Sequence, residues 1–156
     1  MQQSILKCLF FITTLQFFGC STNTVFEKNI KLAEGTWKYE NIPVFEPEIS
    51  DTVSRYNLYL NLRHSNDYAF SNMWVKVHTT LPSGKKMESR VELPLADKSG
   101  KWFGKDSGSI INQQVSIQSN AIMPELGKYK FELEQNMRVD ALTEVISVGL
   151  TIEKTQ

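Results

Sequence analysis

The sequence predicts an all-β domain, an antiparallel β-sandwich of the jelly-roll or Greek-key type with about seven to nine strands. Three observations predict it. Apolar and polar residues alternate over several short segments, turn-forming residues separate these segments, and beyond the N-terminal region no stretch has the periodicity of a long helix. Short strands at fairly regular spacing are typical of sandwiches and barrels. The order of the strands does not follow from the sequence.

The first apolar segment, residues 41–49, contains Pro43 and Pro47. Proline lacks the N–H donor that a central strand must supply, so we expect this segment at a sheet edge or broken by a bulge. The clearest strand follows over residues 56–63. Its alternation predicts one buried face, with Tyr56 and three leucines, and one solvated face that includes Asn61.

The same alternation recurs over residues 73–77, 91–95, 115–117, 129–133 and 146–152. The predicted core residues are Leu58, Leu60, Leu62, Val75, Val77, Phe131, Leu133, Val148, Leu150 and Ile152. Residues 79–86, with sequence TTLPSGKK, are the best hairpin candidate because a loop with Pro and Gly separates two predicted strands. Residues 137–142 give the only helical signal, of one or two turns.

The N-terminal segment has the layout of a secretory signal. Lys7 precedes an apolar run of roughly a dozen residues, which is too short for a comfortable span of the bilayer, and Gly19 and Cys20 end it. Gly19 and Cys20 match the bacterial lipobox. Cleavage between them removes Cys8 and makes Cys20 the N-terminal residue, to which acyl chains are attached. A plain signal peptide, or a buried N-terminal helix with an incidental cysteine, is the alternative.

The predicted organisation is therefore a lipoprotein signal peptide over residues 1–19, a lipidated N-terminus and tether over residues 20–36, and a β-sandwich over residues 37–156. With 17 basic and 17 acidic residues the chain is balanced in charge, which argues against nucleic acid as a partner. We expect no disulfide in the mature domain, because no cysteine other than Cys20 remains.

No catalytic or metal-binding constellation is evident. His64 and His78 stand apart without a zinc-ligand spacing, and no G-x-S-x-G elbow or phosphate-binding loop occurs. Two carboxylate pairs, Glu46 with Glu48 and Glu132 with Glu134, share a strand face and are expected on the solvent side of a sheet. We expect no enzyme activity, no cofactor and no metal.

The most distinctive stretch is residues 92–108, where three glycines surround Trp102 and Phe103. Tryptophan between glycines has two interpretations, which the sequence leaves open. It caps one end of the sandwich core, or it forms part of a loop that meets a partner protein or a sugar ring.

Three separated blocks, YNLYLNLRHSNDYAFSNMWVKV, LPLADKSGKWFGKDSG and GKYKFELEQNMRVDALTEVISVGLTIEK, resemble the GldH family of gliding-motility lipoproteins of Bacteroidetes-type bacteria. The likeness covers roughly residues 56–154. The family's own blocks fall on Arg63, His64, Tyr68, Asn72, Leu95, Ala96, Asp97, Gly100, Lys101, Trp102, Gly104, Met137, Arg138, Asp140, Leu142 and Gly149.

The resemblance implies an outer-membrane lipoprotein on the periplasmic side that serves gliding and the type IX secretion machinery without enzyme activity. The expected partners are membrane lipid, through acylated Cys20, and other gliding-motility proteins. Ser21 to Thr24 lack the acidic residues that usually mark surface export, which favours the periplasmic side. The candidate interaction residues are Asp97, Lys101, Trp102, Phe103 and Arg138. A membrane-anchored glycan-binding module is the alternative, because loop aromatics on sandwiches often stack on sugars.

Overall fold

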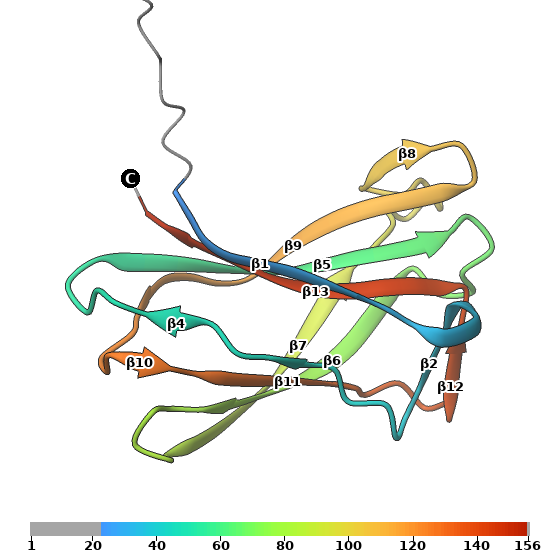
Figure 1. The fold of residues 1–156 in the computed structure, drawn as a ribbon. Helices are drawn as coiled ribbons and strands as arrows, with labels where there is room; N and C mark the ends of the chain where they lie inside the picture. The colour runs from blue at the N-terminus through green and yellow to red at the C-terminus, as the bar shows by residue number, and fades with distance from the viewer. Residues whose placement is uncertain (1–22, 156) are drawn as a thin grey trace, which may run out of the picture.

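The computed structural model describes residues 23–155, which form two antiparallel sheets packed face to face (Figure 1). The predicted all-β sandwich is confirmed. The structure has thirteen strands, one 3₁₀ turn, η1 (Ala33–Gly35), and no α-helix in the described range. No helix of residues 23–155 is long and apolar enough to cross a membrane.

The first sheet has the order β1-β13-β5-β9-β8. Its strands are β1 (Thr24–Lys31), β13 (Val145–Lys154), β5 (Arg55–Ser65), β9 (Ile110–Ile122) and β8 (Lys105–Ser107). The second sheet has the order β3-β11-β6-β7. Its strands are β3 (Val44–Phe45), β11 (Lys130–Gln135), β6 (Asn72–Thr80) and β7 (Lys86–Pro94).

Two short strand pairs complete the fold. Strand β4 (Glu48–Ile49) pairs with β10 (Gly127–Lys128), and β2 (Thr36–Lys38) pairs with β12 (Ala141–Thr143). The count exceeds the predicted seven to nine because these four strands, together with β3 and β8, have only two or three residues each. Such short pairings contain too few residues to show a period-two pattern.

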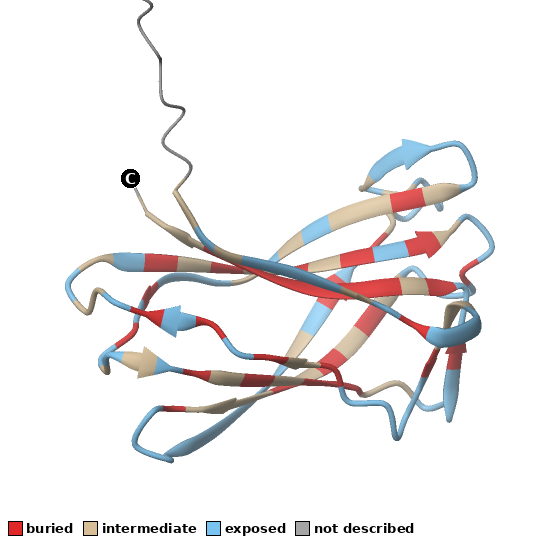
Figure 2. Ribbon diagram, viewed as in Figure 1, coloured by how far each residue is buried: buried red, intermediate tan, exposed pale blue. Residues whose placement is uncertain are grey.

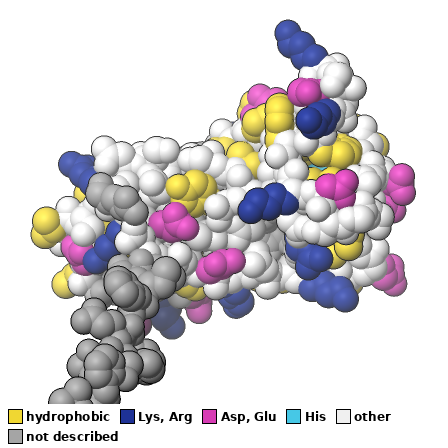
Figure 3. Space-filling view, turned by 90° about the horizontal axis from the view of Figure 1, so that it is seen from above, with side chains coloured by type: hydrophobic (Ala, Val, Ile, Leu, Met, Phe, Trp, Pro, Cys, Tyr) yellow, Lys and Arg dark blue, Asp and Glu magenta, His cyan; other side chains and the backbone are white. Residues whose placement is uncertain are grey.

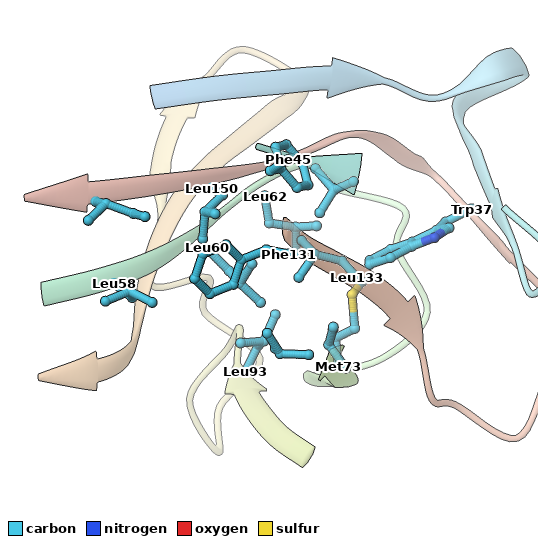
Figure 4. Close-up of a cluster of buried hydrophobic side chains, with 14 of the residues drawn as sticks. Trp37, Phe45, Leu58, Leu60, Leu62, Met73, Leu93, Phe131, Leu133 and Leu150 are labelled. Atoms are coloured by element: carbon cyan, nitrogen blue, oxygen red, sulfur yellow. The ribbon is translucent and has the colours of Figure 1, made fainter. Parts of the chain in front are cut away.

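The core lies between the two sheets (Figure 2). All ten predicted core residues are buried, and their side chains converge with Trp37 and Phe45 in one cluster (Figure 4). Trp37 has no exposed surface, and its indole N–H donates to the carbonyl of Asn41 at 2.8 Å. Burying each leucine side chain stabilises the fold by about 2 kcal/mol relative to leaving it in water.

The predicted hairpin and the predicted edge segment are also confirmed. Residues 81–85 connect β6 to β7, and Leu81 N donates to Lys85 O at 2.9 Å across the turn. Strand β3 forms the edge of its sheet. Pro43 and Pro47 contribute only carbonyl acceptors, to Leu133 N at 3.0 Å and Tyr129 N at 2.9 Å, so neither proline has to supply the donor it lacks.

The tether predicted over residues 20–36 is wrong from residue 24 onward. Residues 24–31 form β1, which pairs with β13 over its whole length, and Leu32 is buried. The strand was missed because it is an edge strand with only three half-buried side chains and no fully buried one. The sandwich therefore begins before the predicted boundary at residue 37. The predicted signal peptide and the predicted lipidation site, Cys20, lie outside the described residues.

The predicted helical turn over residues 137–142 is wrong as well. These residues form a turn followed by β12, and Leu142 is buried opposite Trp37. The side chain of Gln135 holds the turn, because its amide donates to Val139 O at 2.8 Å and its oxygen accepts from Met137 N at 2.9 Å. One or two helical turns cannot offset the cost of helix nucleation against such contacts.

The two ends of the sandwich are defined by β5, whose eleven residues span about 34 Å. We call the end near Arg55 the proximal end and the end near Ser65 the distal end. Asn23 lies at the proximal end, where its carbonyl accepts from Lys154 N at 2.8 Å. Thr155 N donates to Arg55 O at 2.9 Å, and Arg55 pairs with Ile122. The described chain therefore begins at the proximal end, where its C-terminal strand also ends (Figure 1).

Candidate binding groove

The loop over residues 95–104 lies at the distal end and is organised by Asp97. One carboxylate oxygen of Asp97 accepts from Ser99 N at 2.8 Å, from Ser99 Oγ at 2.6 Å and from Lys101 N at 3.0 Å. The hydrogen bond from the Ser99 hydroxyl is the main cause that lowers the pKa of Asp97. Asp97 therefore holds the shape of the turn, which leaves Lys101 exposed at its tip.

The two neighbouring aromatic residues of this loop have different environments. Trp102 is half-buried, and its ring lies 4.6 Å from the ring of buried His64, edge to face. Tyr68 joins the same cluster, at 5.4 Å from His64. Phe103 is 58% exposed. Trp102 thus caps this end of the core, whereas Phe103 offers its ring to solvent.

His64 is fully buried within this aromatic cluster. Its Nδ1 lies 2.8 Å from the carbonyl of Ser65, which requires a proton on Nδ1. Nε2 is buried without a hydrogen-bond partner among the described atoms. Burial lowers the pKa of His64, so the neutral imidazole is the form that this cluster accommodates.

The outer face of the first sheet carries a ladder of amide side chains across its strands. The Asn61 amide nitrogen, on β5, donates to Asn29 Oδ1 on β1 at 3.1 Å and to Thr151 Oγ1 on β13 at 2.8 Å. Gln114, on β9, donates to Asn61 Oδ1 at 3.1 Å. These bonds hold the ladder in a fixed arrangement on a rigid sheet, with amide donors and acceptors left for a ligand.

A groove of about 570 Å³ lies between this ladder and the distal loop. Four residues with amide side chains on the outer face line it: Asn29, Asn61, Asn112 and Gln114. Gln113 also contributes to the lining, but its side chain donates to Pro94 O on β7 of the other sheet at 2.7 Å. Phe103 forms one wall, and the rest of the lining consists of Leu62, Gly104 and the charged residues Glu27, Arg63 and Lys105. Seen from above, most of this outer face is neither hydrophobic nor charged (Figure 3).

Gly104 allows the distal loop to lie close to β9. A Cβ atom at this position would lie 2.5 Å from Ile111 Cγ2 and 2.7 Å from the carbonyl oxygen of Asn112. Only a residue without a side chain fits there, because the second contact is with backbone. Gly104 therefore places Phe103 directly beside the amide ladder.

The groove combines amide side chains, an exposed aromatic ring and three charged residues, Glu27, Arg63 and Lys105, which is the chemistry of a binding site for a polar ligand. Amides bind hydroxyl and peptide groups, and an exposed aromatic ring covers an apolar face of either a sugar or a side chain. Its lining includes a single carboxylate, Glu27, whereas glycoside hydrolysis typically uses two. The lining residues thus suit recognition.

A second polar cluster lies on the outer face of the other sheet. His78 Nε2 lies 2.8 Å from Glu134 Oε2, and His78 Nδ1 lies 3.3 Å from Glu88 Oε2. The hydrogen bond from His78 is the main cause that lowers the pKa of Glu134. Within residues 23–155 no group of three or more His, Cys, Asp or Glu side chains is placed to hold a metal ion.

This cluster corrects the expectation that Glu134 faces solvent with Glu132. Glu134 is only 9% exposed, whereas Glu132 is half-buried. A carboxylate tolerates such burial when it is paired, and Lys76 Nζ lies 3.7 Å from Glu134 Oε1 in addition to His78. The period-two pattern gave no sign of these partners, because they come from a neighbouring strand.

Of the predicted interaction residues, four lie on the distal loop: Asp97, Lys101, Trp102 and Phe103. Arg138 is exposed on a different connection, between β11 and β12. The amide ladder was not predicted as a site. Asn61 was placed on the solvated face of its strand, but its partners on β1 and β9 could be found only with the strand order.

Comparisons with known proteins connect the chain to one family. The family model described as GldH lipoprotein matches residues 24–152. A "Gliding motility lipoprotein GldH homolog" from Christiangramia forsetii is 29% identical over 154 residues, covering 94% of each chain. The "Gliding motility lipoprotein GldH" of Flavobacterium johnsoniae is 27% identical over 150 residues, covering 92% of each chain.

Similarity to solved structures is low. A carbohydrate-binding module specific for non-crystalline cellulose aligns with a TM-score of 0.44 and 7% identity, covering 83% of this chain and 73% of that chain. The VP2 subviral particle of infectious bursal disease virus aligns with a TM-score of 0.36 and 14% identity, covering 81% of this chain and 31% of that chain. Similarities of this size identify neither a ligand nor a partner.

Proposed function

The chain belongs to the GldH lipoprotein family, and from that membership we propose that it is a non-catalytic component of a gliding-motility machinery coupled to type IX secretion. Acyl chains on Cys20 hold it at the outer membrane on the periplasmic side. The sandwich assembles or stabilises the machinery through contacts with other motility proteins. Its relatives named for gliding motility share nearly the whole length of the chain, which supports a role in the same process.

The observation that supports contacts with other proteins is the groove beside Phe103. Its amides are fixed by hydrogen bonds within one sheet, so a partner segment meets a preorganised surface and little side-chain entropy is lost on binding. Asn61 and Phe103 supply the two elements of such a contact, polar specificity and apolar area. Aromatic residues at the centre of an interface often contribute most of the binding energy.

The anchor is tested on the protein isolated from native membranes. Mass spectrometry of the N-terminus is expected to find an acylated Cys20, and Cys20→Ala is expected to move the protein out of the membrane fraction. We expect the Cys20→Ala strain to lose surface spreading. A Cys20→Ala protein that remains in the membrane and supports normal gliding would contradict the anchoring.

The contact surface is tested with a photo-crosslinking amino acid in place of Phe103. Crosslinking in living cells is expected to capture a gliding-motility or type IX secretion protein. Tyr39 is the matched control, because it is an aromatic residue of similar exposure, 51%, that lies outside the groove lining. Equal capture from both positions, or capture of unrelated proteins alone, would remove the groove from the proposal.

Glycan binding is the second candidate, favoured by the same amide ladder beside an exposed ring. Sugars present hydroxyl groups to amides and an apolar face to aromatic rings. Calorimetric titration with peptidoglycan fragments and neutral oligosaccharides tests it. Binding that Asn61→Ala and Phe103→Ala each weaken at least tenfold would support a glycan ligand, and no heat for any of these sugars would exclude the tested classes.

A further inference from the structure

The proximal end carries an unusual share of the exposed apolar side chains. Val53 is 91% exposed, Leu126 is 63% exposed and Ile122 is 57% exposed. They are three of the four most exposed large hydrophobic residues in the described range, and the fourth is Phe103 at the distal end. Exposed apolar residues gathered at one end mark a surface that meets something other than water.

These three side chains are held in place by the ends of the strands. Ile122 is the last residue of β9 and pairs with Arg55. Val53 lies on a turn whose Asp51 accepts from Val53 N at 2.9 Å and binds Lys154 Nζ at 2.6 Å. The hydrogen bonds of the turn and of the strand end therefore fix the positions of Val53 and Ile122.

Leu126 is held in a similar way. The connection that carries it is bound to the β6–β7 hairpin, because Glu125 accepts from Ser83 N and Ser83 Oγ, each at 2.8 Å. The next residue, Gly127, pairs with Ile49. Leu126 thus projects from a fixed connection at the same end as Val53 and Ile122.

The described chain begins at this same end. The carbonyl of Asn23 accepts a hydrogen bond from Lys154 N, and three peptide units separate Asn23 from Cys20. Three residues reach at most about 10 Å even when fully extended. If Cys20 carries acyl chains in the bilayer, Asn23 is held within about 10 Å of the lipid surface, and the proximal end is held there with it.

We propose that the proximal end of the sandwich rests on the bilayer, with Val53, Ile122 and Leu126 in the interfacial layer of the lipid. This inference rests on the proposed lipidation of Cys20. The occupant is a lipid surface because the anchor brings that surface to these side chains. Partitioning of apolar area into the interface adds to the hold of the acyl chains.

Charge contributes less to this contact than the apolar side chains. Arg55, Lys85 and Lys128 are exposed at the proximal end and suit anionic headgroups. Glu48 lies opposite Lys128 in the strand register and offsets part of that attraction. Neutral and anionic bilayers are therefore both expected to be contacted.

The test uses the full mature lipoprotein in vesicles of phosphatidylethanolamine and phosphatidylglycerol. A thioether-linked Cys20 has no free thiol and no other cysteine remains after residue 20, so one introduced cysteine takes a polarity-sensitive fluorophore. We compare Leu126→Cys with Phe103→Cys, which replaces a side chain of similar exposure, 58%, at the distal end. Labels at Leu126→Cys and Val53→Cys are expected to shift to the blue and to be quenched by spin-labelled lipid.

The label at Phe103→Cys is expected to stay in water and to be unaffected by that lipid. An acylated protein whose Leu126→Cys label behaves like the Phe103→Cys label would overturn the inference and leave the proposed anchoring intact. Vesicle flotation and N-terminal mass spectrometry of the same samples report the anchoring separately. A protein without acyl groups that does not float overturns the proposed anchoring and this inference together.

Discussion

The two ends of the sandwich differ in how far their apolar side chains are buried. At the distal end, the loop that contains Trp102 folds back, and its indole packs against the fully buried His64. At the proximal end, Leu126 and Val53 extend into the surroundings, and an apolar cavity of about 210 Å³ lies behind Ile122. Trp102 therefore closes the core at the distal end, whereas the exposed side chains of the proximal end are the ones that we propose the bilayer covers. We therefore expect substitutions of buried distal residues to lower the free energy of unfolding more than substitutions of exposed proximal residues.

The largest expected effect is at Trp102. Trp102→Ala removes the half-buried ring from the His64 and Tyr68 cluster and leaves a cavity, so we expect the free energy of unfolding to fall by about 2–3 kcal/mol. Urea denaturation measures it. Phe103→Ala is the matched control and should change stability by less than about 0.5 kcal/mol, because its ring is exposed. Equal losses at both positions would refute the division of roles between these neighbours.

Gly104 comes next. Gly104→Ala brings a methyl group against the carbonyl of Asn112, so the loop must move away from β9, and we expect a loss of about 1–2 kcal/mol. Denaturation curves are compared with those of Lys101→Ala, an exposed site on the same loop. We also expect Gly104→Ala to reduce crosslinking from position 103, since the ring moves off the groove. Wild-type stability and crosslinking together would show that the close approach is unnecessary.

A smaller effect comes from the charge state of His64. Burial lowers its folded pKa below the unfolded value of about 6.5, so the unfolded chain takes up the proton first as the pH falls. Stability is therefore complete above about pH 6.5 and declines below it, with a slope of at most about 1.4 kcal/mol per pH unit. Unfolding of wild type and His64→Phe is measured between pH 7.5 and 5.

In His64→Phe the decline between pH 6.5 and 5 is expected to be shallower. The lowered pKa values of Asp97 and Glu134 act below this window, because the ordinary pKa of a carboxyl lies near 4. Parallel pH profiles for the two proteins would mean that the distal cluster accommodates the charged imidazole.

The smallest effect on stability is expected at the proximal end. Val53→Ser, Ile122→Ser and Leu126→Ser should each change the free energy of unfolding by less than about 0.5 kcal/mol in detergent, because these side chains are exposed. Combined in one protein, they should weaken lipid quenching of a label at Val25, an exposed residue near the start of β1. Large destabilisation of the isolated domain would make these residues part of its core.

The sequence predicted those features that depend on the residue pattern within a single strand. Leu58, Leu60 and Leu62 alternate with polar residues on a strand with one buried face, so their burial follows directly from the pattern. The glycines around Trp102 and Phe103 likewise indicated a special loop. Strand β1 escaped prediction, because an edge strand buries too little to alternate clearly.

The groove could not be predicted because it depends on distant pairings. Asn29 and Asn61 are 32 residues apart, and Asn61 and Gln114 are 53 residues apart, yet the order β1-β13-β5-β9 brings them onto one face. The His78–Glu134 pair also joins neighbouring strands, 56 residues apart. Local periodicity contains no information about which strands become neighbours.

Strand β5 runs from Arg55 at one end to Ser65 at the other, about 34 Å away, and it is a stiff spacer. With the Arg55 end on the lipid, Asn61 and Phe103 stand at a set height above the bilayer. The protein then diffuses in the plane of the membrane with its groove at a constant distance from the lipid surface. A partner in the same membrane binds only if its complementary segment extends to that distance.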